Sequence, residues 1–213
     1  MQTQDALDRI ARGVRKFQTE IYPAQREMFE RLRHGQEPVA LFVTCADSRV
    51  NPNLVTQTDP GEIFIERNPG NVIPPYVEFV GGVTAGIEYA MLALKVPVIV
   101  VCGHSDCGVM KALLHPEQVE GMPGVQKWMS HAFEARRRMQ QKFGDATEEE
   151  QLRHMTECNV LGQIENLKTH PSVGARLQKG EIEIRGWVYD IGDGSIREAD
   201  PVSGKFELLG RKR

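Results

Sequence analysis

Two apolar runs, each followed at once by residues of the kind that bind metals, constrain this chain more than any other feature. Residues 39–43 precede Cys45, and residues 96–101 precede His104 and Cys107. Apolar runs of this length predict buried strands of a parallel sheet that is covered on both faces. Ligand sites of such sheets lie just outside the carboxyl ends of the strands. The sequence therefore predicts that two thiols and one imidazole lie together at one sheet edge.

These two sulfurs and one nitrogen are a suitable three-ligand set for zinc, with a fourth position left for water or another ligand. Cys107 follows His104 by one helical turn, immediately after the second run. A zinc enzyme is the first hypothesis. A non-catalytic zinc module for protein interaction is the alternative, and its metal would have four protein ligands.

Composition excludes several other classes of protein. The 213 residues suffice for a single domain over residues 1–213 with a substantial core. The net charge is -3 with mixed signs, which gives no electrostatic footprint for nucleic acid. Four cysteines do not make a disulfide framework, residues 1–16 lack a signal-peptide core, and no apolar stretch reaches membrane-spanning length. We therefore expect a protein of the reducing cytoplasm that binds neither nucleic acid nor membrane.

Helix and strand patterns alternate along the chain and divide it into three parts. Residues 1–35 are expected to form an N-terminal helical arm of two helices. The first helix has an apolar stripe that comprises Leu7, Ile10, Val14, Phe17 and Ile21, and the second covers residues 23–34. Residues 36–180 are expected to form a zinc-binding α/β core, and residues 181–213 to add C-terminal edge strands. The predicted fold is α/β, with a central, mostly parallel sheet of four strands, an antiparallel edge strand and flanking helices.

Local signals add detail to this plan. A helix is expected over residues 125–143, and Thr147 with Glu150 predicts a capping box at the start of the next helix. Asp193-Gly194 is a hairpin turn signal. The small residues 81–86 do not match a phosphate-binding loop, because they follow no strand and lack the lysine, so they predict close helix packing instead.

Asp47 and Arg49 alternate with Cys45 beyond the end of the first strand. A guanidinium can hold a carboxylate through two parallel hydrogen bonds. A carboxylate held in this way accepts hydrogen bonds only, so Asp47 could orient a hydroxide on the metal. Released from Arg49, it could bind the metal itself. The alternative is an ordinary exposed ion pair in a turn, worth about 0–1 kcal/mol.

The residues Cys45-x-Asp47-Ser48-Arg49 with His104-x-x-Cys107-Gly108 resemble the motifs of the β-class carbonic anhydrases. The resemblance extends over most of the chain, through Gly61-Glu62-x-Phe64, Arg67-Asn68, Ile73-Pro74-Pro75-Tyr76, Ile87-Glu88-Tyr89-Ala90 and Gly186-Trp187-x-Tyr189. It implies zinc held by Cys45, His104 and Cys107, and reversible hydration of CO2 to bicarbonate and a proton through zinc-bound hydroxide. It also implies that Asp47 and Arg49 form the catalytic pair of a carbonate dehydratase.

Further matching positions imply a substrate site and an oligomer. By this resemblance Phe64 and Tyr89 line the apolar part of the pocket, and the backbone of Gly108 faces the substrate. Gln36 would reach the site of a neighbouring subunit and donate a hydrogen bond to substrate. The resemblance also implies a homodimer or homotetramer in which the N-terminal arm wraps the partner.

The chain departs from the family pattern at three positions. Pro69 stands where a small aliphatic residue is usual, and it fixes φ and removes a backbone N–H. Asp106 stands where a neutral residue is common, and we expect its side chain to point away from the metal. Phe42 replaces the tryptophan of a non-catalytic bicarbonate site, to which Arg67 and Tyr189 would belong, so that site is expected to be absent or weak.

Access to the pocket would decide which substrate is used, and Pro69 is the first residue that could change it, so one alternative substrate class stays open. The same scaffold could act on another linear, CO2-like molecule such as carbon disulfide or carbonyl sulfide.

Overall fold

The computed structural model describes residues 3–76 and 81–210. The chain forms two compact units, residues 1–37 and residues 38–213. The predicted division of a single domain into arm, core and edge strands stays a prediction.

The first unit is helical. Helix α1 (Thr3–Lys16) continues through a π-helical turn (Phe17–Ile21) into α2 (Tyr22–Ala24), and α3 (Arg26–Leu32) follows. The predicted stripe is amphipathic, as expected, and its apolar residues are between 40% and 66% exposed in the single chain. The rings of Phe17, Tyr22 and Phe29 contact one another at the far end of this stripe, with centroids 4.9–6.0 Å apart.

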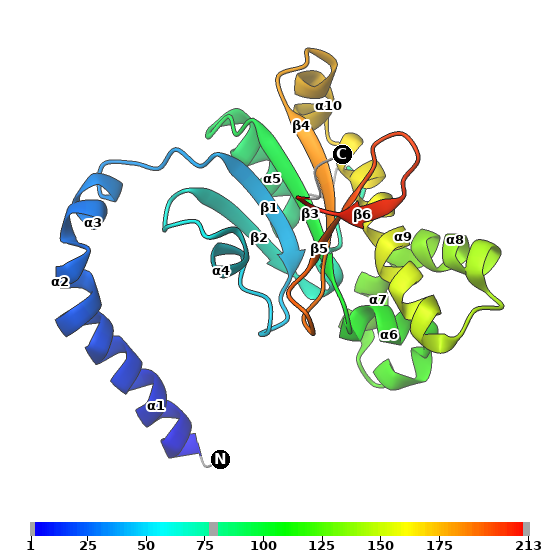
Figure 1. Ribbon diagram of the computed structural model, residues 1–213, viewed down its shortest axis with the longest axis horizontal. Helices are drawn as coiled ribbons and strands as arrows, with labels where there is room; N and C mark the ends of the chain where they lie inside the picture. Colours follow the sequence, from blue (N-terminus) through cyan, green and yellow to red (C-terminus); the bar gives the residue numbers. More distant parts are fainter. Residues whose placement is uncertain (1–2, 77–80, 211–213) are drawn as a thin grey trace. The chain divides into compact units, whose positions relative to one another are not determined.

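The second unit contains a six-stranded sheet in the order β2-β1-β3-β4-β5-β6 (Figure 1). Its strands are β1 (Ala40–Cys45), β2 (Ile63–Asn68), β3 (Val98–His104), β4 (Glu183–Tyr189), β5 (Ile196–Ala199) and β6 (Phe206–Leu208). The first four pair in parallel, which confirms the predicted centre of the sheet. The antiparallel edge consists of β5 and β6, in line with the edge strands expected within residues 181–213, and a second tight turn, with Gly204 at φ 69°, joins them.

Seven α-helices are described in this unit. They are α4 (Pro52–Thr56), α5 (Gly82–Leu92), α6 (Gly108–Leu114), α7 (Pro123–Met129), α8 (Phe133–Phe143), α9 (Glu148–Lys168) and α10 (Pro171–Gln178). The single helix predicted over residues 125–143 is wrong, because a 3-10 turn at Ser130–Ala132 separates α7 from α8. The predicted capping box of Thr147 and Glu150 begins α9. No helix in the described part of the chain is long and apolar enough to cross a membrane.

Alternate residues of the central strands face two different apolar clusters. Leu41, Val43, Ile99 and Val101 pack with residues of α5, α9 and α10 in the larger one. Phe42, Val100 and Cys102 point to the opposite face. This two-sided burial explains why the strands read as continuous apolar runs in the sequence.

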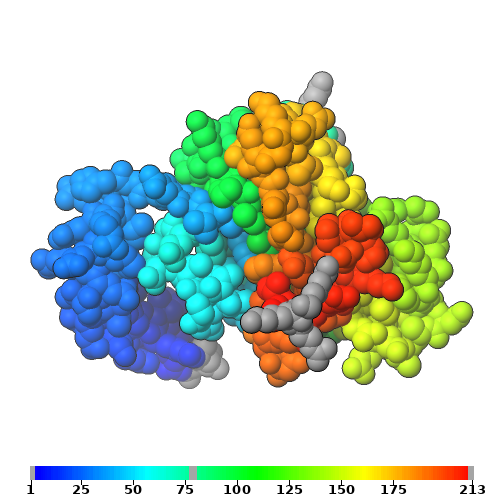
Figure 2. Space-filling view, turned by 45° about the horizontal axis from the view of Figure 1, so that its top comes forward, coloured from blue at the N-terminus to red at the C-terminus, as the bar shows by residue number. Residues whose placement is uncertain are grey.

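Helix α9 packs unusually close to the sheet. A Cβ atom at Gly103 would lie 2.9 Å from Thr156 Cγ2, and one at Gly186 would lie 2.9 Å from Ile164 Cδ1. Glycine at both positions therefore lets α9 approach β3 and β4. A Cβ atom at Gly204, in the turn between β5 and β6, would lie 3.4 Å from Leu161 Cδ1 of α9. Figure 2 shows this red C-terminal part of the chain beside the yellow-green helical part. The close approach holds β3, and hence His104 at its end, against a long helix.

Candidate metal centre and active site

The three predicted ligands lie together at the carboxyl ends of β1 and β3. Parallel pairing sets Thr44 opposite Cys102, so that Cys45 and His104 leave the sheet at the same edge. Cys107 follows the turn after β3 and precedes α6. The ligand atoms of Cys45, His104 and Cys107 all lie within 4.8 Å of one another, and all three residues are buried.

The His104 ring is oriented for a metal ligand. Its Nδ1 lies 2.8 Å from the carbonyl oxygen of Ser105, and a hydrogen bond to that oxygen places the ring proton on Nδ1. Its Nε2 is buried and has no hydrogen-bond partner among the described residues. Ser105 is fixed in turn, because its N–H donates to Tyr189 and its Oγ accepts from the N–H of Ile191. Partners of this kind typically orient metal-binding histidines.

The two thiols lie in one environment, which shifts their pKa values in opposite directions. A hydrogen bond from Cys107 lowers the pKa of Cys45, and the N–H of Gly70 also donates to the Cys45 sulfur at 3.3 Å. The same contact raises the pKa of Cys107, and burial raises it further. Burial alone would lower the pKa of His104, but contacts with Cys45, Ser105 and Asp47 together outweigh it and the net pKa is raised. Two sulfur donors and one imidazole nitrogen are a ligand set that fits zinc.

Asp47 is held by Arg49 beside this cluster. Arg49 Nε donates to Asp47 Oδ1 at 3.0 Å, and Nη2 donates to Oδ2 at 2.8 Å. The backbone N–H of Arg49 adds a bond to Oδ1 at 2.9 Å. These bonds hold the pKa of Asp47 well below its usual range. Asp47 Oδ2 is 3.9 Å from His104 Nε2, so the predicted pair lies next to the ligands.

Two further contacts around this pair were not predicted from the sequence. Arg49 also donates from Nη1 to Asp106 Oδ2 at 2.8 Å, and Asp106 contacts Lys111 through its other oxygen. Asp106 therefore points outward, as expected, and is engaged by two cations. Its backbone has φ 59°, a turn conformation that the residue types alone do not reveal.

Arg67 supports the segment that carries Cys45 and Asp47. Its side chain donates to the carbonyl oxygens of Cys45, Asp47 and Val50, at 3.1, 2.7 and 2.9 Å. The sequence associated Arg67 with a second bicarbonate site. In the structure the guanidinium of Arg67 binds these three carbonyl groups instead, and Phe42 packs edge-on against Trp187.

The remaining predicted site residues are spread around the second unit, apart from Gln36. The rings of Phe64 and Tyr89 contact each other with centroids 5.9 Å apart, and Tyr89 is 51% exposed. Gly108 begins α6 directly after Cys107. Gln36 is exposed and belongs to the first unit. Pro69 is exposed and begins the 3-10 turn after β2, and its carbonyl oxygen accepts a hydrogen bond from Trp128.

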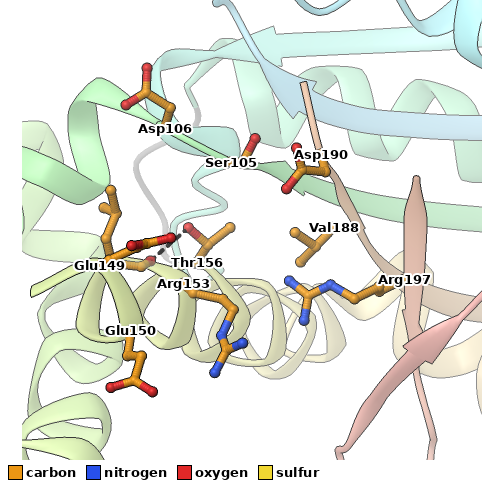
Figure 3. Close-up of a pocket in the computed structure, with 10 residues that line it drawn as sticks. Ser105, Asp106, Glu149, Glu150, Arg153, Thr156, Val188, Asp190 and Arg197 are labelled. Carbon is orange, nitrogen blue, oxygen red and sulfur yellow. Dashed lines mark hydrogen bonds between the residues drawn. The ribbon is translucent and has the colours of Figure 1, made fainter. Parts of the chain in front are cut away.

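A cavity of about 310 Å³ adjoins Ser105 and Asp106 (Figure 3). Arg153 of α9 and Arg197 of β5 line it, together with acidic residues that include Asp190. Its lining contains none of the three predicted metal ligands. The cavity is thus separate from the metal cluster.

Comparison with known proteins agrees with this geometry. The family model described as carbonic anhydrase matches residues 40–196. A carbonic anhydrase of Pseudomonas aeruginosa is 45% identical over 200 residues, which cover 94% of this chain and 90% of that protein.

Two solved structures share the fold. The β-carbonic anhydrase CcaA superposes with a TM-score of 0.92 at 38% identity, covering 96% of this chain and 92% of the other. One of the tetrameric β-carbonic anhydrases of the filamentous ascomycete Sordaria macrospora superposes with a TM-score of 0.80 at 26% identity, covering 97% and 98% of the two chains. The chain therefore belongs to the carbonic anhydrase family, and it is a β-class carbonic anhydrase, a carbonate dehydratase.

Proposed function

We propose that the protein hydrates CO2 reversibly to bicarbonate and a proton, with zinc held by Cys45, His104 and Cys107. The observation that carries this proposal is the convergence of three ligand atoms within 4.8 Å, one of them a buried imidazole nitrogen that has no hydrogen-bond partner in the described part of the chain. Two thiolates and one imidazole leave a fourth coordination position for water or substrate. When bound there, zinc supplies the Lewis acidity that makes water a nucleophile near neutral pH.

Asp47 is assigned as the catalytic residue that orients the attacking water. Both of its oxygens are engaged by Arg49, so the carboxylate stays ionised and accepts hydrogen bonds only. Its Oδ2 faces His104 Nε2 at 3.9 Å, so a hydrogen-bond acceptor lies directly beside the ligands. Arg49 is assigned to hold this carboxylate in place. We also assign Asp47 as a metal ligand for the fourth position, which it would occupy when it leaves Arg49.

The substrate-binding role is assigned to Phe64, Tyr89, Gly108 and Gln36. Phe64 and Tyr89 form a contacting aromatic pair that offers CO2 an apolar surface. Gly108 places a backbone N–H next to the ligand Cys107 with no side chain in the way. Gln36 would donate its hydrogen bond at the site of a partner subunit.

We further infer a homodimer or homotetramer in the cytoplasm. The exposed stripe Leu7, Ile10, Val14, Phe17 and Ile21 supports an oligomer, because it would be buried against a second copy. The solved Sordaria macrospora relatives are described as tetrameric. The cytoplasm is supported by four free, buried cysteines, two of which must stay reduced to bind a metal.

Stopped-flow CO2 hydration combined with metal analysis tests the proposal. The purified protein should contain zinc, lose hydration activity when a chelator removes it, and regain activity when zinc is added back. Cys107→Ser should lose both zinc and activity, whereas Cys102→Ser, which changes a buried thiol outside the cluster, should keep both. A protein that hydrates CO2 equally well after complete zinc removal would overturn the assignment.

A further inference from the structure

We propose that Asp106 is a positioning residue for the reaction, which clamps the Arg49 guanidinium in the one orientation that holds Asp47. Asp106 lies between the ligands His104 and Cys107, but its side chain contacts Arg49 and Lys111. The inference rests on the proposed roles of Asp47 and Arg49. It adds a second carboxylate to that pair.

The guanidinium of Arg49 is engaged along two of its edges. One edge, Nε and Nη2, faces the two oxygens of Asp47. The other edge faces Asp106, whose Oδ2 accepts from Nη1 at 2.8 Å and whose backbone oxygen accepts from Nη2 at 3.1 Å. The donors of a guanidinium form a rigid planar fork, so any rotation of the plane breaks the contacts on both edges.

A second anchor is needed because Arg49 is accessible to water. Its side chain is 44% exposed, and an isolated exposed ion pair gains little from its geometry because solvent competes for both partners. With Asp47 alone, the long Arg49 side chain would sample other rotamers. Asp106 restricts that freedom, so that Asp47 meets a guanidinium already oriented for two parallel hydrogen bonds.

Asp106 is itself held in place for this task. Its left-handed backbone, with φ 59°, turns the chain between β3 and α6. Lys111, one turn into α6, binds the carboxylate oxygen that Arg49 leaves free. Figure 3 shows the Asp106 carboxylate turned away from Arg153 and Arg197, although Asp106 borders the same cavity. Its charge is therefore directed to Arg49 and Lys111.

Two variants of Asp106 separate the contribution of its carboxylate from that of its backbone carbonyl. Asparagine and glycine both tolerate the left-handed conformation, so neither Asp106→Asn nor Asp106→Gly should strain the turn. Asp106→Asn removes the charge and keeps one oxygen, whereas Asp106→Gly keeps only the backbone carbonyl. Asp145→Asn, a change of an exposed acid between α8 and α9, serves as the matched control.

Three measurements on each zinc-loaded protein test the proposal: zinc content, steady-state CO2 hydration, and nitrogen NMR of the Arg49 side chain. The NMR signals of Arg49 are assigned as those that disappear in Arg49→Lys. The expected result is full zinc content and a kcat about tenfold lower or more in both Asp106 variants, with KM changed by less than about twofold. The two Nη groups of Arg49 should give separate signals in the wild type and merge in the variants as rotation becomes free. The control should match the wild type in all three measurements.

Each other outcome counts against a specific claim. Wild-type kcat and unchanged Arg49 signals in both Asp106 variants would overturn the positioning role. Loss of zinc in these variants would also overturn it, because Asp106 would then be supporting the ligand turn. If Arg49→Ala keeps wild-type turnover, the proposed role of the Asp47–Arg49 pair fails. If Arg49→Ala abolishes turnover while the Asp106 variants keep it, only the role of Asp106 fails.

Discussion

Arg49 binds Asp47 through two parallel hydrogen bonds, from Nε to Oδ1 at 3.0 Å and from Nη2 to Oδ2 at 2.8 Å. The carboxylate is thereby fixed with Oδ2 at 3.9 Å from His104 Nε2. The pair stands at the end of β1, two and four residues after Cys45, which we propose as a metal ligand. This contact places the proposed catalytic pair beside the candidate metal cluster.

Loss of either member of the pair should abolish most turnover without loss of metal. Asp47→Asn keeps the shape of the side chain but replaces an acceptor oxygen with a donor, and Arg49→Ala releases the carboxylate. We expect hydration rates to fall about 10²-fold or more in each, a range typical of lost proton-directing groups. Zinc content and stopped-flow rates check this. Wild-type turnover in either variant would contradict the assigned roles.

Arg67 should matter for metal affinity although it contacts no ligand atom. It binds the carbonyl groups of Cys45, Asp47 and Val50, which holds the ligand segment in shape. Loss of a residue that holds metal ligands in place typically lowers metal affinity 10–100-fold, so Arg67→Met should weaken zinc binding by about tenfold or more. Competition with a zinc chelator measures the change. Lys168→Met, which removes an exposed cation far along α9, is the control, and equal affinity in both variants would refute the role.

His170 should make stability depend on pH near neutrality. Burial lowers the pKa of His170, whose ring lies 3.0 Å from the carbonyl oxygen of Pro74. The unfolded chain therefore binds a proton near pH 6.5 that the folded chain still excludes. The stabilising contribution is present above pH 6.5 and is lost as the pH falls below it, with a slope of up to about 1.4 kcal/mol per pH unit.

Urea unfolding of the wild type and His170→Gln between pH 5 and 8 measures this contribution. Glutamine can donate to Pro74 but does not titrate, so the difference between the two proteins should shrink at low pH. A difference that stays constant over the whole range would contradict the prediction.

Gly103 should be intolerant of any side chain. A Cβ there would lie 2.9 Å from Thr156 Cγ2 and 3.0 Å from Val160 Cγ2, so Gly103→Ala should destabilise by about 1–3 kcal/mol through overpacking. It should also lower activity, because His104 is the next residue. Urea unfolding checks the stability change. Gly162→Ala is the matched control, since no atom of the residues that the structure describes lies within 4 Å of its Cβ position, and alanine favours the helix by about 0.5–1 kcal/mol.

Much of the fold was predictable because it depends on local signals. The apolar runs that became β1 and β3 are buried on both faces, and the capping box of Thr147 and Glu150 begins α9 as expected. The break between α7 and α8 was missed because residues 125–143 contain no proline or glycine to mark it after Gly124.

The candidate site was likewise predictable from the sequence only in part. The sequence by itself determined the ligand types and their positions after two strands, since parallel strands must end at the same edge. It also determined the spacing of Asp47 and Arg49 from Cys45. Only the tertiary structure decided that Asp106 binds Arg49 and that Arg67 binds the segment that carries Cys45. Those contacts join residues 57 and 22 positions apart, and they depend on a left-handed turn and on side-chain directions that no local pattern encodes.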